Sequence, residues 1–162
     1  LVVRALHGKY DYRRKLPHLQ KDNRPVFVSF NSHRRWVLPE SVRGLVLDCC
    51  VRWNEVTMDL HVAVVMPDHV HVIFTPRVDP EKTTYSLMQI MHAIKGSSAR
   101  AVNQALHRRG PVWQKEWFDH VLRSSESLRE KVAYVCQNPV RAGLVVSPDR
   151  YPWLWRGKIP IL

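Results

Sequence analysis

The sequence contains few acidic residues, few cysteines and no long apolar run, and each shortage excludes a class of protein. Its 162 residues include 14 Asp and Glu against 25 Lys and Arg, a formal net charge of +11. No stretch approaches the roughly 18 uninterrupted apolar residues of a membrane span. Residues 1–6 are too short and too soon charged to act as a secretory signal. The three cysteines have no CxxC spacing and cannot all pair, which favours a reducing cytoplasm.

The excess of basic residues indicates a polyanionic partner, because no fold requires such a charge by itself. A merely basic protein is one alternative. An anionic membrane surface is another, although no basic amphipathic helix with an aromatic face stands out. Basic residues are dense near the N-terminus, where Arg13 and Arg14 are candidates for phosphate contact. We interpret residues 1–24 as a basic arm or lead-in, or a solvated tail, and residues 25–162 as one domain.

The hydrophobic pattern predicts four strands and three helices, followed by irregular structure over residues 142–155. Ser124 or Ser125 is expected to cap the last helix, and Pro139 to end it. The predicted strands are 25–30, 58–66, 69–75 and 117–123, and the predicted helices are 38–49, 86–107 and 126–138.

The order β-α-β-β-α-β followed by a helix predicts an α+β protein of the ferredoxin-like class. In that fold an antiparallel sheet carries the helices on one face, and here an additional C-terminal helix would follow. The order alone implies no activity, because this fold hosts many functions.

Two histidines separated by one residue, His69 and His71, lie in the third predicted strand. Side chains alternate along a strand, so both imidazoles face the same way. A hairpin closed by a two-residue turn would place Met66 opposite His69 and Val64 opposite His71. The same register pairs His61 with Phe74 on the opposite face, outside any site that contains the pair. The two histidines are either a metal-binding pair or one structural and one exposed residue.

The last predicted helix carries Tyr134 and Asn138, which lie four residues apart and hence on one face. A tyrosine hydroxyl becomes a nucleophile when a cation lowers its pKa or polarises its target. An amide oxygen one turn away could help to hold such a cation. The alternative is a half-buried tyrosine on a helix with a polar end.

Two segments make the sequence recognisable. Residues 66–72, Met-Pro-Asp-His-Val-His-Val, resemble the M-P-N-H-V-H signature of the IS200/IS605-type HUH single-tyrosine transposases. Residues 134–145 resemble the Y-x-x-x-N-P-V-R-A-G-L-V run of the REP-associated tyrosine transposase branch. Residues 16–18, 110–114 and 117–121 fit the same branch in the expected order, so the resemblance covers roughly residues 16–152.

The resemblance implies a metal-dependent endonuclease and strand transferase that acts on single-stranded DNA with imperfect hairpins in a bacterial cytoplasm. His69 and His71 would hold Mg²⁺ or Mn²⁺, and Tyr134 would attack the scissile phosphate to form a 5′-phosphotyrosine link. Asn138 would be the third ligand, directly or through a water, where insertion-sequence members have Gln. Asp68 stands where the family has Asn. The resemblance leaves open a monomer or a homodimer.

Further contacts with DNA are expected from basic and aromatic residues. The candidates for DNA contact, besides Arg13 and Arg14, are Arg34, Arg35, Lys95, Arg100, Trp36 and Trp113.

Two other functions remain possible. One is an inactive or domesticated nucleic-acid-binding module on the same fold, and the other is a metal-dependent hydrolase that uses water.

Overall fold

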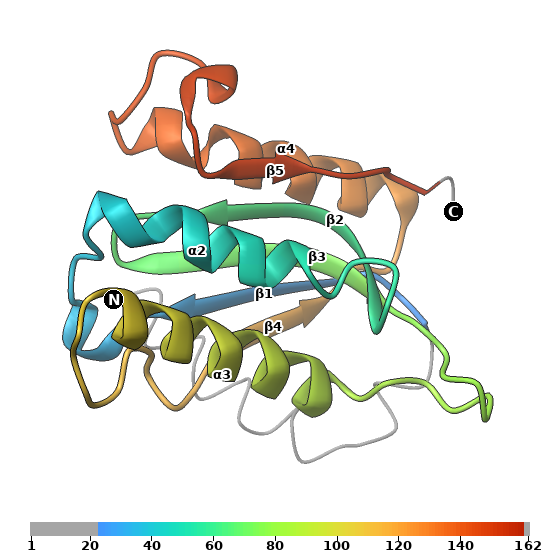
Figure 1. The fold of residues 1–162 in the computed structure, drawn as a ribbon. Coiled ribbons are helices and arrows are strands. Elements are labelled where there is room, and N and C mark those ends of the chain that lie inside the picture. The colour runs from blue at the N-terminus through green and yellow to red at the C-terminus, as the bar shows by residue number, and fades with distance from the viewer. Residues whose placement is uncertain (1–22, 161–162) are drawn as a thin grey trace.

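An antiparallel sheet of five strands forms the centre of the computed structural model, which describes residues 23–160 (Figure 1). The strands lie in the order β4-β1-β3-β2-β5. The order β4-β1-β3-β2 is the one expected of a ferredoxin-like sheet, so the predicted fold class is confirmed. The strands are β1 (Val26–Asn31), β2 (Met58–Val65), β3 (His69–Pro76), β4 (Phe118–Val121) and β5 (Leu154–Arg156).

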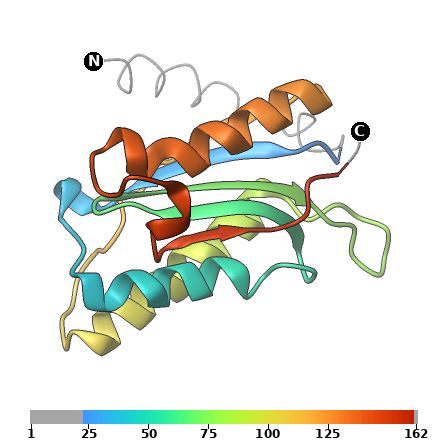
Figure 2. The same cartoon turned by 90° about the horizontal axis from the view of Figure 1, so that it is seen from above.

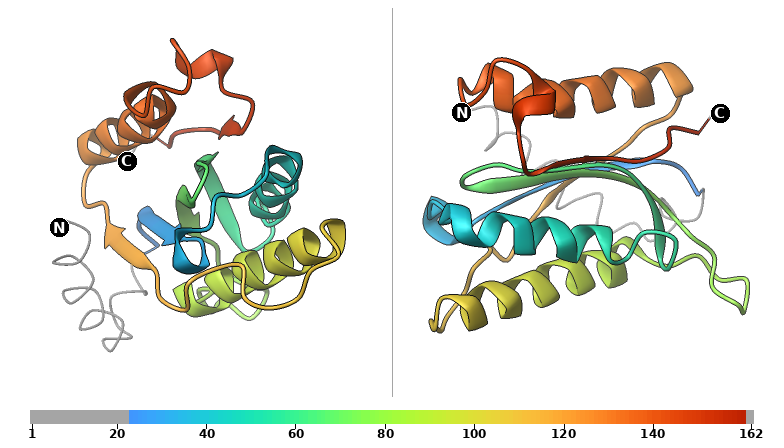
Figure 3. Two further views of the ribbon diagram at one scale, coloured as in Figure 1. Left: turned by 90° about the vertical axis from the view of Figure 1, so that its left-hand side faces the viewer. Right: turned by 45° about the horizontal axis from the view of Figure 1, so that its top comes forward.

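Within residues 23–160, three long helices cover the two faces of the sheet. Figure 2 shows α2 (Glu40–Val51) and α3 (Leu87–Ala105) on one face and α4 (Ser125–Arg141) on the other, and Figure 3 shows the same layers from two further sides. Strand residues alternate between two cores: Val72 packs with α2 and α3, whereas Ile73 packs with α4. The sheet therefore separates the crossover helices from the tyrosine-bearing helix. No helix among residues 23–160 has the length and apolar character of a membrane span.

Helix α4 differs from its predicted bounds at the C-terminal end. Ser124 caps the helix, with its side chain accepting from the Ser127 amide, as expected. Pro139 does not end it, and the helix runs on to Arg141. A proline within a helix loses one amide hydrogen bond. Here the ring is buried, and the Ala142 amide still donates to the Asn138 carbonyl at 3.0 Å, so the last turn closes beyond it.

The pairing of His61 was predicted wrongly. A bulge in β2 makes the register jump from Leu60 opposite Phe74 to Val62 opposite Ile73, which leaves His61 unpaired. Its Nε2 lies 2.8 Å from the Thr75 hydroxyl, and its Nδ1 lies 2.8 Å from the Lys158 carbonyl. Thr75 lies an even number of residues after His69 and His71, so its side chain is on the same face of β3 as theirs. The bulge therefore turns His61, which contacts Thr75, toward that face, but at the far end of β3.

The tail after α4 is more ordered than predicted. Instead of wholly irregular structure, it forms the short helix η3 (Pro148–Arg150) and strand β5, which pairs with β2. Tyr151 anchors this segment by donating from its hydroxyl to the Val65 carbonyl at 2.6 Å. A strand of three residues carries too little periodicity to be identified from sequence.

His61 gives the first prediction. Its side chain is 3% exposed beside a pocket of about 610 Å³, which also contains Glu55, Asp59 and Lys158. Burial lowers the pKa of His61 below its ordinary 6.5, although the bond to the Lys158 carbonyl and the charge of Asp59 oppose this. The folded state then binds a proton less readily than the unfolded chain, so the stabilisation is complete above pH 6.5 and declines below it.

We expect His61→Gln to cost about 1–3 kcal/mol of unfolding free energy near neutral pH, because it breaks two buried hydrogen bonds. The variant should also lose less stability than the parent protein between about pH 8 and about pH 5. Urea denaturation at both pH values measures the two effects. Parallel losses in the two proteins would show that His61 does not contribute to the acid sensitivity.

Candidate functional site

The β2–β3 hairpin places both histidines on the α4 side of the sheet. Val64 lies opposite His71, and the Met66 amide donates to the His69 carbonyl at 2.8 Å, as the predicted register requires. The two imidazole rings meet edge to face, with their centroids 4.7 Å apart. His69 and His71 are therefore neighbours in one patch rather than independent residues.

His69 is oriented by a charged side chain beside it. Its Nδ1 lies 2.7 Å from one carboxylate oxygen of Asp68, and Arg35 pairs with the other oxygen at 3.0 Å. Burial raises the pKa of Asp68, but the hydrogen bond and charge of His69 and the charge of Arg35 outweigh it, so the net shift is downward. Burial lowers the pKa of His69 despite the bond to Asp68. Burial thus favours the neutral form of the imidazole beside the Asp68 carboxylate.

His71 is more deeply placed, at 9% exposure, and its ring stacks on Phe27 of β1 with centroids 5.4 Å apart. Burial depresses its pKa strongly, and the nearby charges of His69, Lys131 and Arg141 add to this. Its Nδ1 is buried without a hydrogen-bond partner in the structure. A neutral imidazole with an unpaired nitrogen has the electronic form that a metal ligand needs.

Helix α4 brings two cations to the ring of Tyr134. Lys131 Nζ lies 4.5 Å from the ring centroid, and the Arg141 guanidinium carbon lies 4.1 Å from it. Arg141 also donates to the Tyr134 carbonyl at 2.8 Å. Tyr134 remains 46% exposed, so these contacts leave it accessible to a substrate.

Lys131 connects the helix to the histidine patch. Its ammonium lies 4.4 Å from the centroid of Phe27, the ring that stacks on His71. Half-burial lowers the pKa of Lys131, and the charge of Arg141 lowers it further. Contacts therefore run without a break from His71 through Phe27 and Lys131 to Tyr134.

Asn138 lies on the same stripe of α4, one turn beyond Tyr134, and its side-chain nitrogen is buried without a partner. The two ends of an amide are exchanged by a flip of the group, which would present the oxygen instead. A metal accepts the oxygen of an amide and not its protonated nitrogen. The unpaired buried nitrogens of Asn138 and His71 are both consistent with side chains that bind a metal ion.

A metal at this site would rely on an unusual donor set. Within residues 23–160, no group of three His, Cys, Asp or Glu side chains is arranged to hold an ion. Two imidazoles and one amide oxygen leave half of the positions of an octahedral ion open. Such a site leaves room for phosphate oxygens or water.

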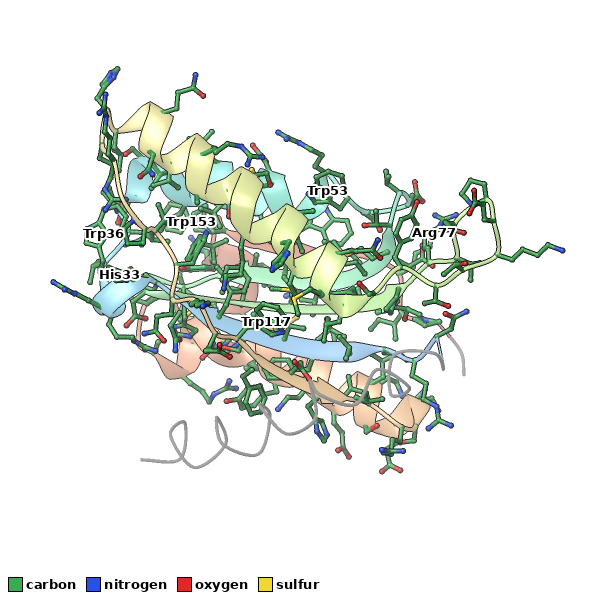
Figure 4. All side chains as sticks on the ribbon, turned by 90° about the horizontal axis from the view of Figure 1, so that it is seen from below. His33, Trp36, Trp53, Arg77, Trp117 and Trp153 are labelled. Atoms are coloured by element: carbon green, nitrogen blue, oxygen red, sulfur yellow. The ribbon has the colours of Figure 1, made fainter. Side chains whose placement is uncertain are left out.

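Among the predicted DNA contacts that the structure describes, Arg35 reaches the histidine patch through Asp68, and none has a recorded contact with Tyr134. Figure 4 shows Trp36 and His33 together at one end of the sheet, with Arg77 at the other. Arg34 and Arg100 are exposed. The Arg108 guanidinium carbon lies over the Trp36 ring, 4.3 Å from its centroid. Lys95 donates to the carbonyls of Gln114 and Lys115. Arg13 and Arg14 lie outside the described residues.

Trp113 is a core residue. It is 6% exposed, packs edge to face on Phe30, and donates from its indole nitrogen to the Ser98 hydroxyl at 2.9 Å. Stacking of a nucleic-acid base on this ring would require Trp113 to leave the core.

Sequence reasoning missed the contacts that complete the site. Lys131 lies three residues before Tyr134 and Arg141 seven after it, and that spacing puts all three on one helical face. The roles of Phe27 and of the Arg35–Asp68 pair depend on strand pairing and loop shape, for which the sequence gives no local signal.

Comparison with known proteins identifies a matching family and a curated relative. The model of the family described as transposase IS200 like matches residues 26–138, which include the histidine pair, Tyr134 and Asn138. A candidate REP-associated tyrosine transposase of Haemophilus influenzae is 24% identical over 94 residues, covering 55% of this chain and 53% of the relative. The chain thus spans about half the length of the curated relative that it matches.

Two of the solved structures that resemble the chain are a transposase and a candidate transposase. One, a REP-associated tyrosine transposase bound to a REP hairpin, has a TM-score of 0.61 and 20% identity, covering 86% of this chain and 89% of that one. The other, a candidate transposase from Deinococcus radiodurans, has a TM-score of 0.48 and 24% identity, covering 70% and 88%. At 20% identity, the likeness to the hairpin-bound structure shows a shared fold alone.

The stack beneath the site gives the second prediction. Phe27 is 4% exposed and lies between His71 and Lys131. We expect Phe27→Ala to lower the unfolding free energy by about 3–5 kcal/mol, because it leaves a cavity between β1 and α4. Phe27→Leu, which keeps most of the apolar volume, should cost clearly less in the same denaturation experiment. Equal losses would show that volume does not determine the role of this ring.

Proposed function

The chain belongs to the family of IS200-like transposases, and from that membership we propose that it cleaves and rejoins single-stranded DNA beside hairpins through Tyr134. The observation that carries the proposal is the exposed Tyr134 ring between two cations, on the helix that covers the face bearing His69 and His71. A nucleophile, a source of positive charge and a pair of imidazoles are thereby gathered in one region of the molecule.

The proposed reaction exchanges one phosphodiester for another. The Tyr134 hydroxyl loses its proton and its oxygen forms a bond to phosphorus, while the bond from phosphorus to the 3′ oxygen breaks and that oxygen takes up a proton. A 5′-phosphotyrosine and a free 3′-hydroxyl result. Attack by another 3′-hydroxyl reverses the step, so rejoining needs no external source of energy.

A divalent ion, Mg²⁺ or Mn²⁺, is part of the proposal. His69 and His71 would hold it through neutral imidazoles, with the Asn138 oxygen as a third ligand after a flip of the amide. When bound, the ion would polarise the scissile phosphate and offset the charge that develops on it. The unpaired buried nitrogens of His71 and Asn138 support this assignment.

Lys131 and Arg141 are the residues we assign to the phosphate itself. Among residues 23–160, no carboxylate forms an ion pair with either cation. A half-buried ammonium without a carboxylate partner is costly in the free protein, and an anion beside it would relieve that cost. These two cations would therefore bind the phosphate against the Tyr134 hydroxyl and stabilise its charge during transfer.

The proposed partner is single-stranded DNA that contains a hairpin, bound by a monomer or a homodimer. The net charge of +11 favours binding to a polyanion, and a protein of the same fold has been solved with a REP hairpin. We place the reaction in the bacterial cytoplasm, where the free thiols of Cys49, Cys50 and Cys136 would stay reduced.

Tyr134→Phe gives the third prediction. It should abolish both cleavage and the covalent protein–DNA adduct, because phenylalanine lacks the attacking oxygen. Labelled hairpin-flanked single strands, incubated with Mg²⁺ or Mn²⁺ and separated on denaturing gels, report both products. Tyr85→Phe, which changes a tyrosine just before α3 on the other face of the sheet, is the matched control and should keep both.

Three outcomes of that experiment lead elsewhere. Cleavage without any adduct in the parent protein would indicate a hydrolase that uses water. Binding without cleavage would indicate a nucleic-acid-binding module. An adduct that persists in Tyr134→Phe would assign the nucleophile to another residue.

The cations around Tyr134 give the fourth prediction. Lys131→Met and Arg141→Met should each lower the single-turnover cleavage rate by about 10²-fold, because each removes one charge that stabilises the phosphate. Arg129→Met removes an exposed charge from the same helix and should leave the rate nearly unchanged. An equal fall in all three variants would mean that only the overall charge of α4 matters.

A further inference from the structure

A loop after β1 is fastened to the turn that precedes His69. The Ser32 amide donates to the Asp68 carbonyl at 2.9 Å, and the Ser32 hydroxyl shares its proton between the Trp36 carbonyl at 2.6 Å and the Asp68 carbonyl at 3.0 Å. The Leu38 amide donates to the Pro67 carbonyl at 2.7 Å. Ser32 is fully buried, so these bonds are shielded from water. The loop and the turn therefore form one rigid unit.

The backbone of this loop is held in an unfavourable conformation. Arg34 and Arg35 have φ angles of 52° and 57°, in the left-handed region that side chains with a Cβ rarely adopt. Backbone strain of this kind persists only where the surroundings impose it. The strained loop places the Arg35 side chain against Asp68.

Arg35 and His69 occupy different oxygens of the same carboxylate. The Arg35 Nε and one terminal nitrogen each lie 3.0 Å from Asp68 Oδ2, while His69 Nδ1 lies 2.7 Å from Oδ1. Both oxygens are therefore used, and the carboxylate is fixed in one orientation. Asp68 belongs to the turn and Arg35 to the strained loop, so the three side chains are held from two separate segments.

This arrangement sets the position of the proton on His69. An ionised carboxylate can only accept hydrogen bonds, so the short contact requires the proton to be on Nδ1. In a neutral ring the lone pair is then on Nε2. A carboxylate that holds the far nitrogen of a histidine in this way fixes the tautomer and makes the other nitrogen a better metal ligand.

We propose that Arg35 and Asp68 are positioning residues that hold His69 with its proton on Nδ1 and its Nε2 free to bind the divalent ion. Asp68 orients the imidazole, and Arg35 orients Asp68 and compensates its negative charge beside a site that must accept DNA. The inference rests on the proposed function for its purpose, but the tautomer is a property of the free protein. Arg35 thus acts through Asp68 and His69, besides any contact with DNA.

The first arm of the test measures the tautomer without metal or DNA. Long-range ¹H–¹⁵N spectra of the full chain with labelled histidine distinguish the two tautomers, and His69→Gln identifies the signal. We expect the Nδ1–H form in the parent protein and in Asp68→Asn, whose amide oxygen still accepts. Asp68→Ala should lose the preference, and Arg35→Gln should weaken it. The same Nδ1–H population in Asp68→Ala as in the parent would overturn the proposal.

The second arm measures the affinity for Mn²⁺ by calorimetry. Loss of such a partner commonly weakens metal binding by about 10–100-fold, which we expect for Asp68→Ala, with recovery in Asp68→Asn. Arg77→Gln is the matched control, because it breaks another Arg–Asp pair, to Asp59, at the far end of the sheet. Equal weakening in Arg77→Gln and Arg35→Gln would overturn the role of Arg35.

The two proposals fail separately. Neither arm measures cleavage, so both can be repeated in the Tyr134→Phe background. An unchanged tautomer in Asp68→Ala with an intact phosphotyrosine adduct in the parent would reject only the positioning role. A missing adduct with the expected tautomers would reject only the transposase reaction.

Discussion

The register of the β2–β3 hairpin is the constraint on which the site depends. Side chains alternate along a strand, so a slip of one residue would turn His69 and His71 to the core formed by α2 and α3. The two-residue turn at Pro67 and Asp68 prevents this slip, since Met66 bonds directly to His69 across it. The same turn is held by Ser32 and Leu38 from the loop after β1. Two chain segments therefore fix one register, and the register places the histidines under the tyrosine helix.

The cluster of positive charge at the site favours binding of an anion. Lys131 and Arg141 contact Tyr134, and their charges also depress the pKa of His71. A folded protein tolerates such repulsion where a ligand relieves it, and a phosphate between these groups would do so. Burial is the main cause that lowers the pKa of both imidazoles, and positive charge adds to it, from Arg35 at His69 and from Lys131 and Arg141 at His71. The lowered pKa favours the neutral form, which is the form that binds a metal ion. One arrangement of charge thus serves the nucleophile and the proposed metal ligands together.

Much of this could be predicted from the sequence, because the longer elements carry clear periodicity. Local pattern and topology predicted the strands around the histidine pair, the helix starts near Ser86 and Ser124, and the fold class. The failures have physical causes that local pattern does not show. Burial of the Pro139 ring lets α4 continue, a bulge redirects His61, and three residues of β5 are recognised only by pairing. Likewise, the strained loop that carries Arg35 is set by tertiary bonds to Asp68.

The short outer strands also determine how the sheet behaves toward other molecules. The outer strands are β4, with four residues, and β5, with three, whereas β2 has eight residues, seven of them buried. An exposed edge strand with apolar side chains is a template for intermolecular pairing and aggregation. Strand β5 covers part of the edge of β2, and Arg156 and Gly157 end the pairing next to the bulge. Strand β5 thus replaces part of the long, buried edge of β2 with a short outer strand, which offers less backbone for pairing with other copies of the protein.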